Sequence, residues 1–346
     1  MTARQTRHAV VLATAALVAA LSVTTGTAWS HGADPPLPAP NGHGPVALLV
    51  GGRFGPANTL ALDAKGRTLA YGLGSETVSA FSVCPDGRRV AVITDLDRGA
   101  SVAIREVDTM RLVRRQRLGS VYSGARPHCA SADGVQLVAF FGSGPDFDKT
   151  AQVVRFTPHG TATIWRGLAW NATFWRNLTF VQDGASIVAV DAHTGLAKKL
   201  GTVPVAGAYQ LVANPAGTRL VGESYNEGLA CCPRLLVIDL KSSPIRLHQM
   251  PHPGTVIGAD GQEVWVSNDR FAFLGSAPKV TIYSATLRAL TRFGRWNVSS
   301  STVALRSNLL GLRANGTLVA AGLPSGPVRV VRRLPGHADV IAAAAR

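Results

Sequence analysis

Short stretches in which apolar and polar residues alternate recur along the chain, and each is bounded by a turn rich in Asp, Gly or Pro. Residues 89–93, 136–140 and 263–267 are examples. Alternation with a period of two is typical of half-buried β-strands, and Asp-Gly supplies the positive φ angles that a tight hairpin needs. Beyond the first thirty residues, helical periodicity of useful length is absent apart from an Ala-rich tail at 342–345. The pattern therefore predicts an all-β fold built from hairpins.

One unit of about 45 residues repeats, and it contains four short strands separated by two polar or Gly-containing turns. The first turn recurs at spacings of 45, 49, 34, 48 and 45 residues, at Asp63, Asp108, Thr157, Asp191, Asp239 and Ser284. The second turn recurs at Asp86-Gly87, Asp133-Gly134, Asp183-Gly184, Ala216-Gly217 and Asp260-Gly261, and it is degenerate in the sixth unit. Four strands in a unit of this length match one blade of a β-propeller.

Strands left over at the two ends of the repeat region predict how the propeller closes. Six complete units cover about 57–308, and four further candidates are Val46–Val50, Leu310–Arg313, Thr317–Ala321 and Val328–Arg332. Pairing the N-terminal strand with the C-terminal ones would leave no exposed sheet edge. We expect seven blades, with six as the alternative, closed by the N- and C-terminal strands. The interval of 34 residues departs most from the period.

Several segments resemble the repeats of bacterial propeller families. Five segments follow one another in the order found in YVTN-type repeats, namely Val102–Ile104, Asp108-Thr109, Leu118-Gly119, Arg126-Pro127 and Ser131–Gly134. Residues 84–89 are similar to the Ser-Pro-Asp-Gly-Lys turn of TolB-like and WD40-like propellers. The resemblance covers roughly residues 46–335 and implies the propeller fold. It implies little about chemistry, because these families include binding proteins, scaffolds and a minority of enzymes.

The two ends of the chain differ from the repeat region. Residues 1–30 have a basic start and an uncharged apolar run over 9–23, typical of a signal peptide cleaved after Ala28 or Ser30. A membrane anchor is the other interpretation, but about 15 apolar residues are short for a bilayer. We expect a Pro- and Gly-rich linker at 31–45, the propeller at 46–335, and a C-terminal tail at 336–346. The protein is then secreted or otherwise extracytoplasmic, with no transmembrane segment after cleavage.

The chain is strongly basic, with 35 Lys and Arg against 20 Asp and Glu and a formal net charge of +15. In the densest basic stretch, Arg111, Arg114, Arg115 and Arg117 alternate with apolar residues, which indicates an edge strand rather than a nucleic-acid-binding arm. We therefore expect no nucleic-acid partner. We also expect a monomer. A protein or an anionic cell-envelope polymer is the expected partner.

Four cysteines are available for disulfides if the chain is exported. Cys84 and Cys129 precede the Asp-Gly turns of successive units, so neighbouring blades can bring them together as a disulfide or as a buried pair of thiols. Cys231 and Cys232 are adjacent, in a predicted loop before the strand Leu235–Ile238. They can form a vicinal disulfide, pair elsewhere or stay reduced.

The aromatic segment 164–180 is the best candidate ligand site. Trp170 and Trp175 flank a predicted turn at 171–173, and Arg176 follows. Aromatic faces beside Arg can stack on sugar rings or bases. Packing between blades is the alternative for such residues. His128 is a further candidate, because its place in the unit can turn it toward the central channel.

Asp146 and Asp148 are a weak candidate for a calcium site, with a solvated turn as the alternative. We expect no other cofactor. The nucleophile elbow, the His-Glu-x-x-His motif, the phosphate-binding loop and the haem attachment site are all absent from the sequence.

These features favour a non-enzymatic binding or scaffold protein that acts outside the cytoplasm through loops on one propeller face. The alternative is a propeller lyase, hydrolase or lactonase-like enzyme acting on carbohydrate or cell-envelope material.

Overall fold

The computed structural model describes residues 48–343, with gaps at 52–58, 64–67, 73–77, 95–100, 108, 110, 118–123, 131–134, 142–149, 158, 204–207, 227–228, 254–261, 275–278, 295, 299–301, 306, 314 and 334–339. The expected signal peptide at 1–30 and linker at 31–45 lie outside the described residues. The chain divides into Met1–Pro36 and Leu37–Arg346, and all that follows concerns the second unit.

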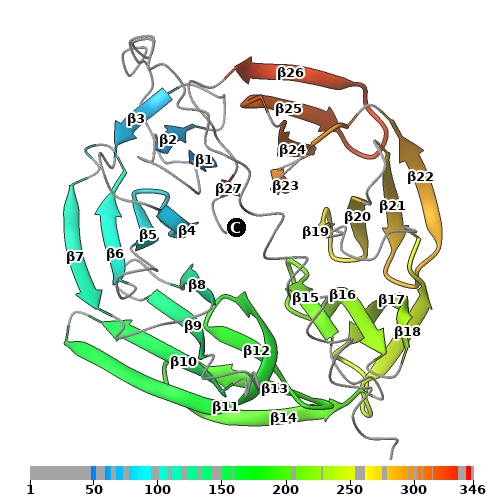
Figure 1. Cartoon of the computed structure of the whole chain (residues 1–346), viewed down its shortest axis with the longest axis horizontal. Helices are drawn as coiled ribbons and strands as arrows, with labels where there is room; N and C mark the ends of the chain where they lie inside the picture. Colours follow the sequence, from blue (N-terminus) through cyan, green and yellow to red (C-terminus); the bar gives the residue numbers. More distant parts are fainter. Residues whose placement is uncertain are drawn as a thin grey trace, which may run out of the picture. The chain divides into compact units, whose positions relative to one another are not determined.

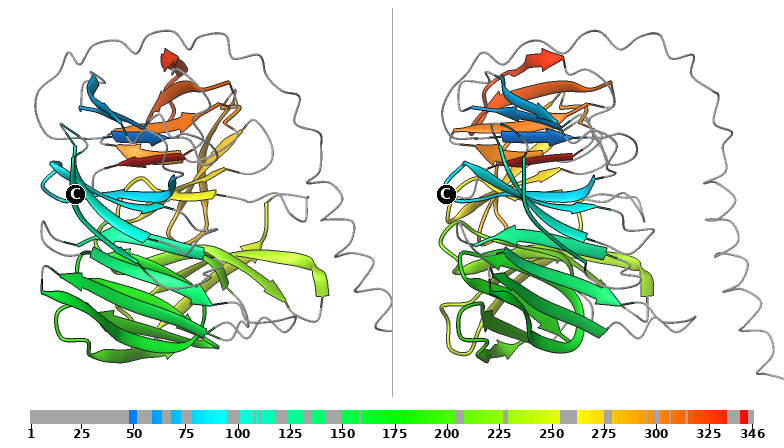
Figure 2. Two further views of the ribbon diagram at one scale, coloured as in Figure 1. Left: turned by 60° about the vertical axis from the view of Figure 1, so that its left-hand side comes forward. Right: turned by 90° about the vertical axis from the view of Figure 1, so that its left-hand side faces the viewer.

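Every described element of this unit is a β-strand, and every described strand pairing is antiparallel (Figure 1 and Figure 2). The sheets follow one another around a common centre, which is the arrangement of a β-propeller. The expected all-β propeller fold is therefore confirmed. No described segment is a helix long and apolar enough to cross a membrane.

Five of the sheets are four-stranded blades. One contains the first and last described strands in the order β27-β1-β2-β3, with β1 (Leu48–Gly51), β2 (Thr59–Leu62), β3 (Thr68–Gly72) and β27 (Val340–Ala343). The other four follow chain order: β4 (Val78–Val83), β5 (Arg89–Thr94), β6 (Ser101–Glu106) and β7 (Leu112–Arg117); β15 (Ala208–Ala213), β16 (Arg219–Asn226), β17 (Leu229–Asp239) and β18 (Arg246–Pro251); β19 (Gln262–Trp265), β20 (Arg270–Leu274), β21 (Val280–Ser284) and β22 (Ala289–Phe293); β23 (Thr302–Leu305), β24 (Asn308–Leu312), β25 (Thr317–Gly322) and β26 (Val328–Arg333).

The remaining strands form one continuous seven-stranded sheet. Its strands are β8 (Gly124–Cys129), β9 (Val135–Phe141), β10 (Thr150–Thr157), β11 (Gly160–Trp175), β12 (Leu178–Asp183), β13 (Ser186–Asp191) and β14 (Ala197–Thr202). The expectation of seven blades, with six as the alternative, is therefore wrong, because five four-stranded blades are present beside this larger sheet.

The 16-residue strand β11 explains the error. Its residues up to Leu168 pair with β10, and its residues from Ala169 pair with β12. No connection interrupts it, so the chain needs fewer residues here, and the repeat shows its short interval of 34. The second turn of the repeat also changes its place. Asp183-Gly184 joins β12 to β13, whereas Ala216-Gly217 joins the first two strands of its blade.

The two ends of the propeller pair with each other, although not through the expected strands. Leu48–Gly51 pairs with Val340–Ala343, which lies in the range expected to be a tail. The three strands expected to pair with the N-terminal one form β24, β25 and β26 instead. The innermost strand β27 contacts the neighbouring innermost strands β23 and β4, so it completes the ring.

The hydrophobic core lies between adjacent sheets. Phe180 and Ile187 of the seven-stranded sheet pack with Leu220 and Ile238 of the next blade, and all four are buried. The predicted edge strand over the basic stretch is confirmed as β7, the outermost strand of its blade.

A disulfide joins two neighbouring sheets. Cys84 follows β4 and Cys129 ends β8, both innermost strands, and their Cα atoms lie 4.7 Å apart. Both cysteines are fully buried. Of the two possibilities for this pair, the disulfide is the one present. Cys231 and Cys232 lie within the strand β17 rather than in a loop, and their side chains are outside the described part.

Candidate functional site

The candidate site is built on the hairpin turn between β11 and β12. Trp175 pairs with Leu178, so Arg176 and Asn177 are the two turn residues. Arg176 has a φ of 50°, in the left-handed region, where a side chain with a Cβ costs about 1 kcal/mol. The turn therefore needs other contacts to hold it in place.

One such contact comes from His128 on the innermost strand β8. Its Nε2 lies 2.9 Å from the carbonyl oxygen of Arg176, and its ring stacks on Phe174 with centroids 4.8 Å apart and planes 5° from parallel. Burial lowers the pKa of His128 to about 4, and the bond to the Arg176 carbonyl opposes this only partly. A neutral imidazole at pH 7 donates its Nε2 hydrogen to that carbonyl.

Trp175, the last residue of β11, ties the same turn to the next blade. Its Nε1 donates a hydrogen bond of 2.8 Å to the carbonyl oxygen of Pro215, in the turn between β15 and β16. Gly217 of that turn lies so close to the indole that a Cβ there would overlap the ring. The Arg176 guanidinium carbon lies 5.0 Å from the centre of the same ring. Trp175 is thus a half-buried platform between sheets, and Arg176 is the exposed group it carries.

The structure brings together three of the residues selected from sequence, namely His128, Trp175 and Arg176. Trp170 lies in β11, and its side chain is outside the described part. The turn expected at 171–173 is wrong, because β11 continues through it. The carboxylates Asp146 and Asp148 lie outside the described residues.

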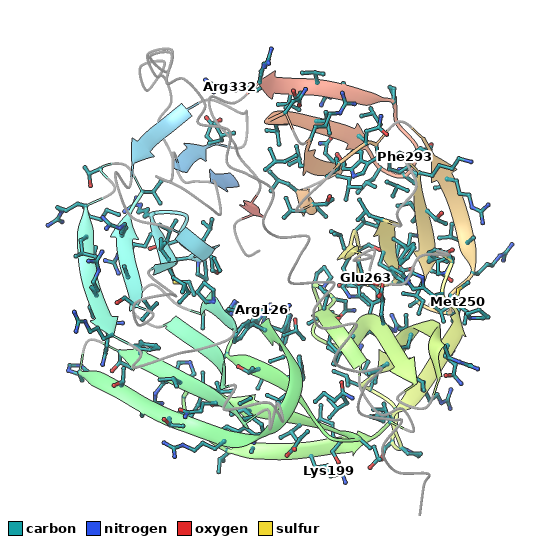
Figure 3. The ribbon with its side chains drawn as sticks, viewed as in Figure 1. Arg126, Lys199, Met250, Glu263, Phe293 and Arg332 are labelled. Atoms are coloured by element: carbon teal, nitrogen blue, oxygen red, sulfur yellow. A yellow bond between two sulfur atoms is a disulfide. The ribbon has the colours of Figure 1, made fainter. Side chains whose placement is uncertain are left out.

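A second polar cluster, which the sequence did not reveal, is buried between the blade β15–β18 and the blade β19–β22. Glu223 of β16 accepts a hydrogen bond of 2.8 Å from Nε2 of His252, and both side chains are 6% exposed. Glu263 of β19, labelled in Figure 3, is 3% exposed. Its carboxyl group interacts with that of Glu223. His252 also meets the edge of Phe273, at a centroid distance of 5.1 Å.

Glu263 keeps a proton to higher pH than an ordinary glutamate does. Burial, and then the nearby charge of Glu223, raise its pKa well above the usual range. Among the described residues no hydrogen-bond donor reaches its two carboxyl oxygens, and Glu223 offers only acceptors. A protonated Glu263 resolves both difficulties by donating to Glu223.

The sequence does carry a signal for this cluster. Glu223 follows the apolar residues Leu220 and Val221, and Glu263 precedes Val264 and Trp265. A carboxylate inside a strand that is buried on both faces needs a partner. Which strand supplies the partner depends on how neighbouring blades pack, and the alternation along one strand does not give that.

Within the described part of the chain, no three His, Cys, Asp or Glu side chains gather as they would around a metal ion. No protein-family model matches the sequence, and no curated protein is similar to it. The YVTN resemblance therefore stays an expectation, while the propeller fold rests on structure.

Solved structures share the fold at low sequence identity. A candidate 6-phosphogluconolactonase from Bacteroides uniformis is 14% identical with a TM-score of 0.57, over 86% of this chain and 98% of that one. An oligogalacturonate lyase in complex with manganese is 13% identical with a TM-score of 0.52, over 77% and 82%. BamB from Moraxella catarrhalis is 12% identical with a TM-score of 0.50, over 84% of each chain. These likenesses define the class of the protein as a β-propeller and go no further.

Proposed function

We propose that this chain is an exported, non-enzymatic binding or scaffold protein that acts outside the cytoplasm through loops on one propeller face. The observation that carries the proposal is the β11–β12 turn, where Trp175 and His128 hold Arg176 with its guanidinium exposed. A guanidinium held in this way binds a carboxylate or phosphate with little loss of side-chain entropy. The partner is a protein or a cell-envelope polymer that presents such a group.

Export has two supports. The first thirty residues have the pattern of a signal peptide. The disulfide between Cys84 and Cys129 is the second, because stable disulfides belong to oxidising compartments.

Photo-crosslinking in an exporting host tests the proposal. A photoreactive amino acid replaces either Asn177, the turn residue next to Arg176, or, as the matched control, Asn315. Both are turn asparagines, but Asn315 lies in the β24–β25 turn, at the opposite end of the strands. We expect a chain cleaved after Ala28 or Ser30 by intact mass, with crosslinks from position 177 and not from position 315. Crosslinks from 315 alone, crosslinks from neither position, or an uncleaved chain retained in the cytoplasm would overturn the proposal.

An enzyme is the second candidate, as a lyase, hydrolase or lactonase-like protein acting on carbohydrate or cell-envelope material. The buried carboxyl pair favours it, because a protonated Glu263 beside the acceptor Glu223 has the form of a general acid and its base. Turnover of a lactone or an oligogalacturonate by the exported chain, lost in Glu263→Gln, would support this candidate. Absence of turnover of both substrates would argue against it.

A further inference from the structure

The outermost strands of the propeller concentrate its positive charge. β3, β7, β14, β18, β22 and β26 are the last strands of their sheets and lie on the outside of the ring (Figure 1). β7 and β26 carry three Arg each, β14 two Lys, and β18 and β22 one Arg each, while none of the six strands contains Asp or Glu. We call the surface of these six strands the outer rim. The outer rim carries a large share of the positive charges that give the chain its formal net charge of +15.

The cations of the outer rim face solvent on several sides of the molecule. Arg117 of β7, Arg292 of β22, and Arg329 and Arg333 of β26 are all exposed. Figure 3 shows the labelled Lys199 of β14 and Arg332 of β26 at the outer edge, on opposite sides of the ring. The charge is therefore spread around the circumference and not gathered into one patch.

This distribution selects among anionic partners by shape. A flat lipid surface touches only a short arc of a convex rim, so most of the cations would stay in water. A flexible linear polymer can follow the circumference and meet several strands at once. Residues two apart in a strand, such as Arg115 and Arg117, lie about 7 Å apart along it and repeat charge on one side.

The donor chemistry favours phosphate. All the rim cations outside β14 are Arg, whose planar guanidinium can bind two phosphate oxygens at once. An outermost strand also has unpaired backbone N–H groups along its open edge, which add further donors for anionic oxygens. We propose that the outer rim binds a flexible, linear, phosphate-bearing polyanion that is not a nucleic acid. This goes beyond the proposed function, which uses the loops of one face.

Two variants of equal charge test the proposal on the exported chain. The rim variant combines Arg117→Gln, Arg329→Gln and Arg333→Gln. The control variant combines Arg88→Gln, Arg270→Gln and Arg288→Gln, three exposed residues outside the outermost strands. Binding of fluorescent long-chain inorganic polyphosphate is measured by anisotropy across a series of salt concentrations. Thermal melting of each variant confirms that it is folded.

We expect the rim variant to bind polyphosphate about 10- to 100-fold more weakly than the wild type at 0.1 M salt. The slope of log affinity against log salt should fall by about 2, because each cation that neutralises a phosphate contributes about 0.7. The control variant should retain most of the affinity. Arg176 and Asn177 are unchanged in both variants, so failure here leaves the crosslinking result at that turn intact.

Three outcomes would overturn the proposal. Equal losses in the two variants would mean that only the net charge attracts polyphosphate. Tighter binding to vesicles of anionic phospholipid, weakened by the rim substitutions, would assign the outer rim to a lipid surface. Tighter binding to single-stranded DNA than to polyphosphate would assign it to nucleic acid.

Discussion

His128 and Glu263 respond to pH in opposite directions, because their surroundings differ. For His128, the pKa is lowered from 6.5 to about 4. The unfolded chain therefore binds a proton that the folded chain lacks between these values, so His128 makes the fold less stable as pH falls through this window. For Glu263 the pKa is raised, and the folded chain keeps a proton that the unfolded chain loses. The stability that this proton contributes is lost as pH rises toward the folded pKa.

Replacing Glu263 with Gln should therefore remove a pH dependence. The amide cannot ionise, and its NH₂ group can donate to Glu223 as the protonated carboxyl does. Above pH 6 and up to the folded pKa of Glu263, the wild type should lose stability on raising pH by up to about 1.4 kcal/mol per pH unit relative to Glu263→Gln. Urea unfolding at a series of pH values measures the difference.

Glu106→Gln is the matched control for this experiment. Glu106 is on the surface, where its hydrogen bond to Arg111 lowers its pKa, so it is fully ionised in this range in both the folded and the unfolded chain. Its replacement should leave the slope above pH 7 unchanged. If the stability of Glu263→Gln followed the wild-type curve at every pH, the interpretation that a protonated Glu263 donates to Glu223 would be wrong.

At the scale of the element, substitutions of Gly184 and Gly217 distinguish backbone strain within a turn from packing between blades. Both glycines have left-handed φ values, 55° and 66°. A Cβ at Gly184 would meet nothing within 4 Å, whereas one at Gly217 would overlap the Trp175 ring. Each substitution by Ala should cost about 1 kcal/mol for the backbone, and Gly217→Ala should cost about 1–3 kcal/mol more.

Chemical denaturation of both variants checks this prediction. Because Trp175 supports Arg176, Gly217→Ala should also reduce crosslinking from the neighbouring position 177, while Gly184→Ala should not. Equal losses of stability in the two variants would show that the contact between Gly217 and Trp175 contributes nothing.

The sequence predicted what depends on local geometry. Asp86-Gly87 forms a turn because Gly87 takes a φ of 65° and the Asp86 side chain accepts a hydrogen bond of 2.9 Å from the Arg88 backbone. Such signals lie within a few residues of each other. The continuous strand β11 has no local signal of this kind, because nothing in its residues shows that one strand pairs with two different hairpins. The predicted number of blades was wrong for that reason.

The sequence likewise predicted only part of the candidate site. His128 and Arg176 were selected for their chemical type, and the structure joins them across 48 residues of chain. Trp175 was selected as a ligand platform, and it instead carries Arg176 and anchors the turn to Pro215. Glu263 meets Glu223 only because two blades pack together, a relation that the pattern within either blade does not contain.

At the scale of the whole molecule, the ring depends on contacts between distant parts of the chain. The disulfide joins β4 to β8 across 45 residues. The pairing of β1 with β27 joins the first and last described strands. Sheets in a propeller contact mainly their neighbours, so a single missing contact opens the ring and exposes two sheet edges.

Deleting residues 336–346 should therefore destabilise the whole propeller rather than one blade. The deletion removes β27, leaves the edge of β1 unpaired, and ends the contacts of β27 with β23 and β4. We expect the midpoint of thermal unfolding to fall by roughly 5–10 °C, followed by circular dichroism. Deletion of 344–346 alone, which spares β27, is the control and should leave the midpoint unchanged. Equal midpoints for the two deletions would mean that the ring closes without β27, and the backbone amides of β1 would then remain protected from hydrogen exchange in both.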